Sequence, residues 1–138
     1  MSENSPSERM VAPFRTHNGI VWDGEVVRCT TQQHHANVGG GIHGGLISAM
    51  LDAVMGGNVI LVLPPEKMAV TSSMTVNYLN AGRIGDTLVA SATVRRVGRT
   101  LAYVDGTCTR DGEQTPLATA TGVFAIIARP TRHPLVRH

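Results

Sequence analysis

One acidic residue of this sequence stands where acids are uncommon. Asp52 lies within residues 46–55, where every other side chain except that of Ser48 is small or apolar. Burying an unpaired carboxylate costs free energy, so a carboxylate in this position is expected to be paired, hydrogen-bonded or catalytic. Because a carboxylate can serve as a general base or as a nucleophile, Asp52 is the first candidate for chemistry.

The stretch that must position Asp52 starts with glycines. Residues 40–45 read Gly-Gly-Ile-His-Gly-Gly and predict a turn that leads into one long helix. We expect this helix to end near Gly56-Gly57, where glycine suits the left-handed conformation of a helix cap. A helix that is apolar on almost every side is expected to be buried. Ser48 is expected to bond back to the carbonyl four residues earlier.

The chain after this helix alternates with period two, which predicts strands. We expect strands over residues 68–80, 87–97, 100–110 and 117–128, and an earlier one over 25–33 after the hairpin signal Asp23-Gly24. Short turns favour antiparallel pairing, and small side chains on one face would let a helix lie close to the sheet. The predicted fold class is therefore α+β, an antiparallel sheet wrapped around one long central helix. The small residues are Ala90, Ala92, Ala102, Gly106, Cys108, Ala118, Ala120 and Gly122.

Composition narrows the function classes. The 138 residues suit one domain, predicted over 14–128 between flexible segments 1–13 and 129–138. A net charge of +2, scattered arginines and few aromatic residues argue against a nucleic-acid partner. The apolar runs of the sequence are too short to predict a membrane span. Cys29 and Cys108 match no zinc spacing. With a polar N-terminus and two thiols expected to be reduced, we predict a cytoplasmic protein.

The glycine-rich stretch resembles a known family. The motif Asn37-x-x-Gly40-x-x-His43-Gly44-Gly45, with Asp52 nine residues after the histidine, is similar to that of the phenylacetic-acid-degradation (PaaI-like) hotdog acyl-CoA thioesterases. The resemblance extends over roughly residues 18–128. It implies a hotdog fold and the hydrolysis of an acyl-CoA thioester to a free carboxylic acid and coenzyme A.

The resemblance also implies roles for single residues. Asp52 would be the general base or nucleophile, and the backbone amide of Gly44 would stabilise the oxyanion at the helix N-terminus. Asn37 would orient water or the thioester, and His43 would brace the turn more than transfer a proton. A hydroxyl on the strand after the helix would hold the attacking water. That hydroxyl falls on Thr71, although strand parity makes Ser72 the alternative unless a bulge shifts the register.

Expected ligands and partners follow from the same resemblance. Gly45, Ser72 and Arg99 are the predicted substrate-binding residues, with Arg99 preferred for the phosphates of coenzyme A because a guanidinium suits phosphate oxygens. The other arginines considered for that role are Arg83, Arg95 and Arg96. No cofactor and no metal are expected, since no acid or thiol lies at ligand spacing beside the histidines. We expect a homodimer, or a homotetramer built as a dimer of dimers, with active sites shared between chains.

Two other functions stay open from the sequence. A hotdog protein that binds acyl-CoA without hydrolysing it is the main alternative, although the presence of Asp52 and Asn37 argues against it. A hotdog hydratase or dehydratase is the second, although His43 precedes a double glycine instead of the motif that such an enzyme needs. The acyl group cannot be read from these residues.

Overall fold

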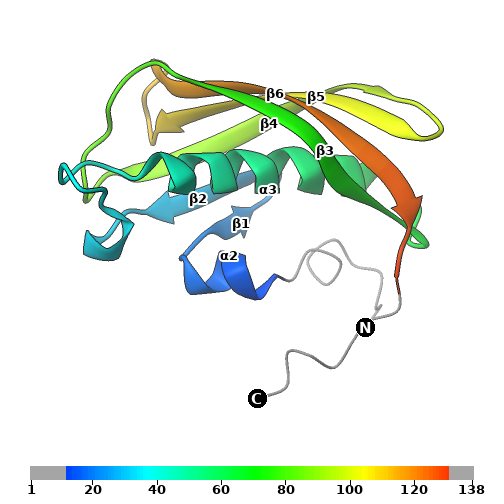
Figure 1. Ribbon diagram of the computed structural model, residues 1–138, viewed down its shortest axis with the longest axis horizontal. Helices are drawn as coiled ribbons and strands as arrows, with labels where there is room; N and C mark the ends of the chain where they lie inside the picture. The colour runs from blue at the N-terminus through cyan, green and yellow to red at the C-terminus, as the bar shows by residue number, and fades with distance from the viewer. Residues whose placement is uncertain (1–11, 131–138) are drawn as a thin grey trace.

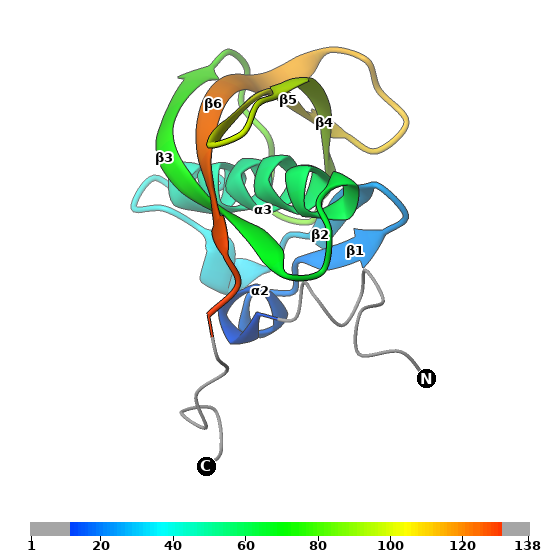
Figure 2. The same cartoon turned by 90° about the vertical axis from the view of Figure 1, so that its right-hand side faces the viewer.

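The computed structural model describes residues 12–130. In these residues, two helices and six strands follow one another as α2 (Pro13–His17), β1 (Val21–Asp23), β2 (Val26–Thr30), α3 (Gly44–Val62), β3 (Lys67–Tyr78), β4 (Thr87–Val97), β5 (Leu101–Arg110) and β6 (Pro116–Ala128), with a short 3-10 turn at Gln33–His35. All strand pairs are antiparallel, in the order β1-β2-β4-β5-β6-β3. The sheet curves around α3, as Figure 1 and Figure 2 show from two sides. The predicted fold class is confirmed.

Helix α3 packs unusually close to the sheet because glycines face it. A Cβ atom added at Gly106 would lie 2.8 Å from the sulfur of Met55, and one at Gly122 would lie 2.6 Å from the Met55 methyl carbon. The side chains of Leu51 and Met55, on the sheet side of the helix, are fully buried. The face of small residues expected from the sequence therefore lies against the helix, and it fixes how closely α3 approaches the strands.

The end of α3 differs from the expectation. The helix runs through Gly56-Gly57 and ends at Val62, followed by Leu63 at φ −96° and ψ 154°. Pro64 accounts for this end, since the residue before a proline is driven out of the helical conformation. Gly56 instead lets Phe124 approach, because an added Cβ would lie 3.1 Å from its ring. At 19 residues α3 could cross a membrane by length and composition, but its burial by the sheet accounts for its apolar character.

The N-terminal part also differs from the expectation. The strand predicted over residues 25–33 is confined to β2, and the preceding segment holds the short helix α2. In Figure 2, α2 lies across the open side of the sheet, below α3. Nearly all of the segments predicted to be flexible, 1–13 and 129–138, lie outside the described residues, so the domain boundaries stay predictions.

Candidate active site

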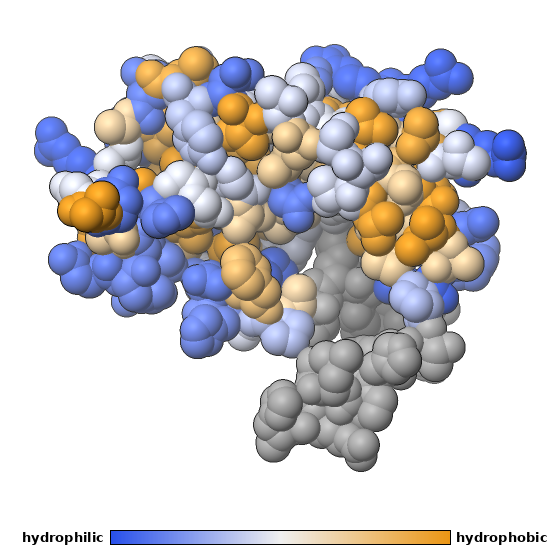
Figure 3. Space-filling model, in the orientation of Figure 1, coloured by the Kyte–Doolittle hydropathy of each residue, from blue (hydrophilic) through white to orange (hydrophobic). Residues whose placement is uncertain are grey.

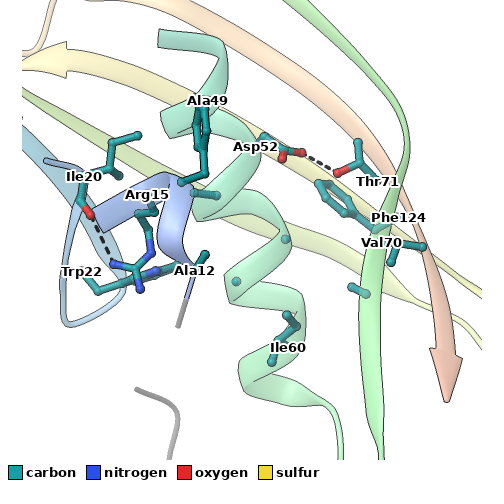
Figure 4. Close-up of a pocket in the computed structure, with 15 residues that line it drawn as sticks. Ala12, Arg15, Ile20, Trp22, Ala49, Asp52, Ile60, Val70, Thr71 and Phe124 are labelled. Carbon is teal, nitrogen blue, oxygen red and sulfur yellow. Dashed lines mark hydrogen bonds between the residues drawn. The ribbon is translucent and has the colours of Figure 1, made fainter. Parts of the chain in front are cut away.

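Asp52 lies on α3 where the helix faces the start of β3. Its carboxylate is half-buried, and its Oδ1 atom accepts a hydrogen bond of 2.5 Å from the hydroxyl of Thr71. Figure 4 shows the two side chains pointing at each other across the gap between helix and strand. In the described part of the chain Asp52 forms no ion pair. The carboxylate is therefore oriented by a neutral donor and keeps an oxygen available for chemistry.

A β-bulge decides which hydroxyl meets Asp52. Thr71 pairs with Phe124, but the next pair along β3 is Ser73 with Val123, so Ser72 is the extra residue. The bulge turns Thr71 toward the helix, whereas simple alternation favoured Ser72. Ser72 is exposed and does not line the pocket beside Asp52. The contact agrees with the role expected of Thr71, while the roles of both residues stay predictions.

A pocket of about 430 Å³ opens beside Asp52. This volume lies within the usual range for small-molecule sites, which is roughly 300–1,000 Å³. Small residues of α3 leave the space, and Asp52 and Thr71 stand at one side of it while Arg15 and Trp22 stand at the other (Figure 4). The remaining walls are apolar, and they come from Ala12, Phe14, Ile20, Ala49, Ala53, Gly56, Gly57, Ile60, Ala69, Val70 and Phe124.

Arg15 is a pocket residue that sequence reasoning missed. Its Nη1 atom donates to the carbonyl of Ile20 at 3.2 Å, which holds the guanidinium between α2 and β1. Burial lowers the pKa of Arg15 from its ordinary value. No motif in the sequence pointed to this residue, because α2 itself was not predicted. The pocket is thus mainly apolar, with one acidic side chain, Asp52, and one cationic side chain, Arg15, on its walls.

The N-terminus of α3 leaves one amide unused. His43 is the N-cap, and its Nδ1 atom accepts from the Gly45 amide at 2.8 Å, while the Leu46 amide donates to the His43 carbonyl. The Gly44 amide has no hydrogen-bond partner among residues 12–130. Since helix N-termini favour anions, the Gly44 amide is the donor available to a developing negative charge. This contact agrees with the bracing role expected of His43, which stays a prediction.

Asn37 shapes the glycine-rich turn before α3. Its side-chain oxygen accepts from the amides of Gly39 and Gly41, each at 3.0 Å, and its Nδ2 atom donates to the carbonyl of Ile42 at 3.4 Å. Asn37 also lines a second pocket of about 380 Å³, together with Gly44. The structure therefore gives Asn37 a local structural task, and its predicted contact with substrate stays a prediction.

Tyr78 is the second site residue that sequence reasoning missed. The last residue of β3, it lines the second pocket, and its hydroxyl donates to the Gly44 carbonyl at 2.9 Å. The Ser48 hydroxyl hydrogen-bonds the Tyr78 hydroxyl. Ser48 therefore reaches the carbonyl of Gly44, four residues earlier, through the tyrosine and not directly as expected.

The arginines considered for coenzyme A are spread out. Arg99 is exposed in the turn between β4 and β5 and does not line the pocket beside Asp52. Arg95 is engaged in an ion pair of 2.6 Å with Asp105. Arg83 follows Ala81 and Gly82, which line the second pocket. Substrate binding by Arg99 stays a prediction, and so does binding by Gly45, whose amide is taken up by His43.

The described residues contain no cluster of three or more histidine, cysteine or acidic side chains that could hold a metal ion.

Within one chain, the two groups predicted to act on the substrate carbonyl, the Gly44 amide and the Asp52 carboxylate, are far apart. Gly44 and Asp52 are separated by eight residues of one helix, or about 12 Å along its axis. A catalytic group must come within about 3 Å of its target. One carbonyl therefore cannot reach both the Gly44 amide and the Asp52 carboxylate of the same chain.

Known proteins share this fold and site region. The sequence model of the thioesterase superfamily matches residues 39–117. Acyl-coenzyme A thioesterase 13 of Homo sapiens is 28% identical over 104 residues, which cover 74% of this chain and 66% of that protein. A Bacillus halodurans protein solved with CoA is 28% identical with a TM-score of 0.77, covering 88% of this chain and 80% of that one. The PaaI protein of the Escherichia coli phenylacetic acid degradation operon shares the fold, at 24% identity and a TM-score of 0.77 over 91% and 92% of the two chains.

Proposed function

The chain belongs to the thioesterase superfamily, with the hotdog fold, and from this membership we propose that it hydrolyses acyl-CoA thioesters to a free carboxylic acid and coenzyme A. The observation that carries the proposal is the Asp52–Thr71 pair at the wall of an apolar pocket. The CoA bound to the Bacillus halodurans protein and the name of the human relative support this substrate class.

Asp52 would attack the thioester directly or activate a water molecule. The hydrogen bond from Thr71 fixes one carboxylate oxygen, so the other can accept a proton or attack the carbonyl carbon. In either case the thioester oxygen becomes negative and the thiolate of coenzyme A leaves. After direct attack the acyl group is held on Asp52 as a mixed anhydride, which a water molecule must then hydrolyse to release the free acid and restore the carboxylate. The Gly44 amide would stabilise the oxyanion, since it projects from the helix N-terminus without a described partner.

We propose that each active site is shared between two chains of a homodimer, which would assemble further into a dimer of dimers. The support is the separation of about 12 Å between Gly44 and Asp52, which a second chain could close. Strand β3 stands at an edge of the sheet, and a free strand edge invites pairing. Figure 3 shows apolar side chains gathered at the end of the molecule where β6 ends. Exposed apolar residues of the elements that meet there are Val62, Val70, Val97, Leu101 and Ile127.

The test of the activity is a panel of acyl-CoAs of different chain lengths and aromatic acyl groups, with released thiol measured by a chromogenic disulfide. We expect turnover by the natural protein and its loss in Asp52→Asn. Asp105→Asn is the matched control, since Asp105 pairs with Arg95 on another strand. Absence of turnover with every substrate, or full activity of Asp52→Asn, would refute the proposal. Tight acyl-CoA binding without turnover would favour a non-catalytic binder.

The test of site sharing mixes two inactive variants. Asp52→Asn removes the acid, and Gly44→Pro removes the amide hydrogen. If each site takes one group from each chain, random pairing in an equal mixture makes half of the dimers mixed, and each mixed dimer has one intact site of two. The mixture should recover about a quarter of natural activity in this C2 arrangement. No recovery after confirmed subunit exchange would contradict a shared site.

A further inference from the structure

We propose that Tyr78 is a positioning residue, which holds the first turn of α3 so that the Gly44 amide points correctly at the oxyanion. This inference rests on the proposed function, in which the Gly44 amide is the donor. It assigns a task to a residue that neither touches Asp52 nor belongs to the glycine-rich motif.

The hydroxyl of Tyr78 takes part in a directed chain of hydrogen bonds. A phenol has one proton, and that proton goes to the Gly44 carbonyl over 2.9 Å. In its bond with Ser48, the phenol oxygen must therefore accept, and the serine hydroxyl must donate. The order is Ser48 to Tyr78 to the Gly44 carbonyl. Hydrogen bonds linked in this way strengthen one another, so removing Ser48 should weaken the hold of Tyr78.

The peptide unit between Gly44 and Gly45 is held at both ends. Tyr78 binds its carbonyl, and the Nδ1 atom of His43 accepts from its amide at 2.8 Å. With this peptide plane fixed, the neighbouring amide of Gly44 keeps one direction. The tyrosine ring adds a steric limit, because a Cβ atom added at Gly44 would lie 3.3 Å from two of its ring carbons.

Tyr78 connects the first turn of α3 to the sheet. It pairs with Ala118 at the end of β3, and the following amides of Leu79 and Asn80 donate to the Leu117 carbonyl at 2.8 and 3.2 Å. The phenol is therefore anchored on β3 and β6, whereas Gly44 belongs to α3. Loss of the hydroxyl would remove this tie between the Gly44 carbonyl and the sheet, and displacements well below one hydrogen-bond length are enough to weaken an oxyanion contact.

The test uses the two tyrosines of the chain. Tyr78→Phe removes only the hydroxyl, and Tyr103→Phe is the matched control because Tyr103 lies on β5 and lines a different pocket. We expect kcat to fall about tenfold in Tyr78→Phe, the typical worth of one hydrogen bond, and not to change in Tyr103→Phe. Affinity for a dethia-CoA ketone, which keeps the carbonyl but cannot be hydrolysed, should be unchanged in both.

A second measurement tests whether the hydroxyls act as one unit. Ser48→Ala alone should lower kcat by less than Tyr78→Phe, and it should have no further effect in the Tyr78→Phe background, because the chain of bonds is already broken. Equal kcat for Tyr78→Phe and Tyr103→Phe, a loss of ketone affinity that matches the loss of kcat, or additive effects of the two hydroxyls would overturn the inference. Absence of turnover by the natural protein would instead refute the proposed function.

Discussion

Replacing Gly44 by proline would remove the one amide hydrogen of the proposed oxyanion site and put a ring carbon in its place. Proline has no amide hydrogen, yet it is favoured at the first position of a helix, where the amide has no partner within the helix. Gly44 is that first residue of α3. His43 before it has φ −62° and ψ 129°, which is the extended conformation that a residue preceding proline requires. The backbone at this position thus already has the form that proline needs.

The expected fall in kcat depends on the hydrogen-bond donor that the substitution removes and on the atoms that it adds. Loss of one oxyanion donor typically lowers kcat by about 10²–10³-fold. Proline also adds a Cβ atom, which would lie 3.3 Å from the ring of Tyr78 and require the ring to shift slightly. Gly44→Ala adds the same atom and keeps the amide hydrogen, so it is the matched control for the steric effect. The ratio of kcat between the two variants reports the replacement of the amide hydrogen by the Cδ atom of the proline ring.

The assay is steady-state hydrolysis of the best acyl-CoA substrate by both variants, with thermal unfolding to show that each is folded. We expect Gly44→Pro to be at least about a hundredfold slower than Gly44→Ala, at similar melting temperature. Equal rates in the two folded variants would refute the reasoning, because the Gly44 amide would then have no part in stabilising the oxyanion. A large loss in both would point to the fit against Tyr78.

Three further predictions concern the core and the surface. Gly106→Ala should lower the free energy of unfolding by about 1–3 kcal/mol in urea titrations through overpacking against Met55, and an unchanged midpoint would contradict this. Burial raises the pKa of the Cys108 thiol to about 12, so at pH 8 it should react with a thiol reagent only after denaturation. The backbone amide of Arg83 holds the pKa of Asp86 below its ordinary value, with Arg110 contributing. Asp86→Asn should therefore cost about 1 kcal/mol at neutral pH, and this difference should be lost as pH falls through the depressed pKa; a constant difference across the titration would contradict the reasoning.

Local signals predicted most of the sheet. Strand β4 covers the predicted residues 87–97, and β5 and β6 each begin within one residue of the expectation. Alternation of apolar residues and the glycine turns between strands are properties of neighbouring residues, so one sequence is enough to read them. The superfamily and the hotdog fold were likewise identified correctly from the motif around His43 and Asp52.

Long-range contacts set the features that sequence reasoning missed. The glycines at 56 and 57 suggested a helix end, but Gly56 is needed where Phe124 approaches from a strand far along the chain. The sequence left open whether a bulge would place Thr71 or Ser72 toward the helix, and the pairing of β3 with β6 decides for Thr71. Tyr78 acts on Gly44 across 34 residues. Each of these depends on a partner that no local pattern reveals.

Packing of the helix on the sheet and chemistry at the site are linked through one short distance. The hydrogen bond of 2.5 Å between Thr71 and Asp52 joins β3 to α3, and it can form only if the helix lies close to the strands. The glycine at 106 sets that closeness through Leu51 and Met55, which flank Asp52 on the helix. A methyl group at 106 that pushed α3 outward would therefore lengthen this bond as well as destabilise the fold. Gly106→Ala should consequently lose kcat even at temperatures where it is fully folded, whereas a substitution that only loosened the fold would leave kcat unchanged there.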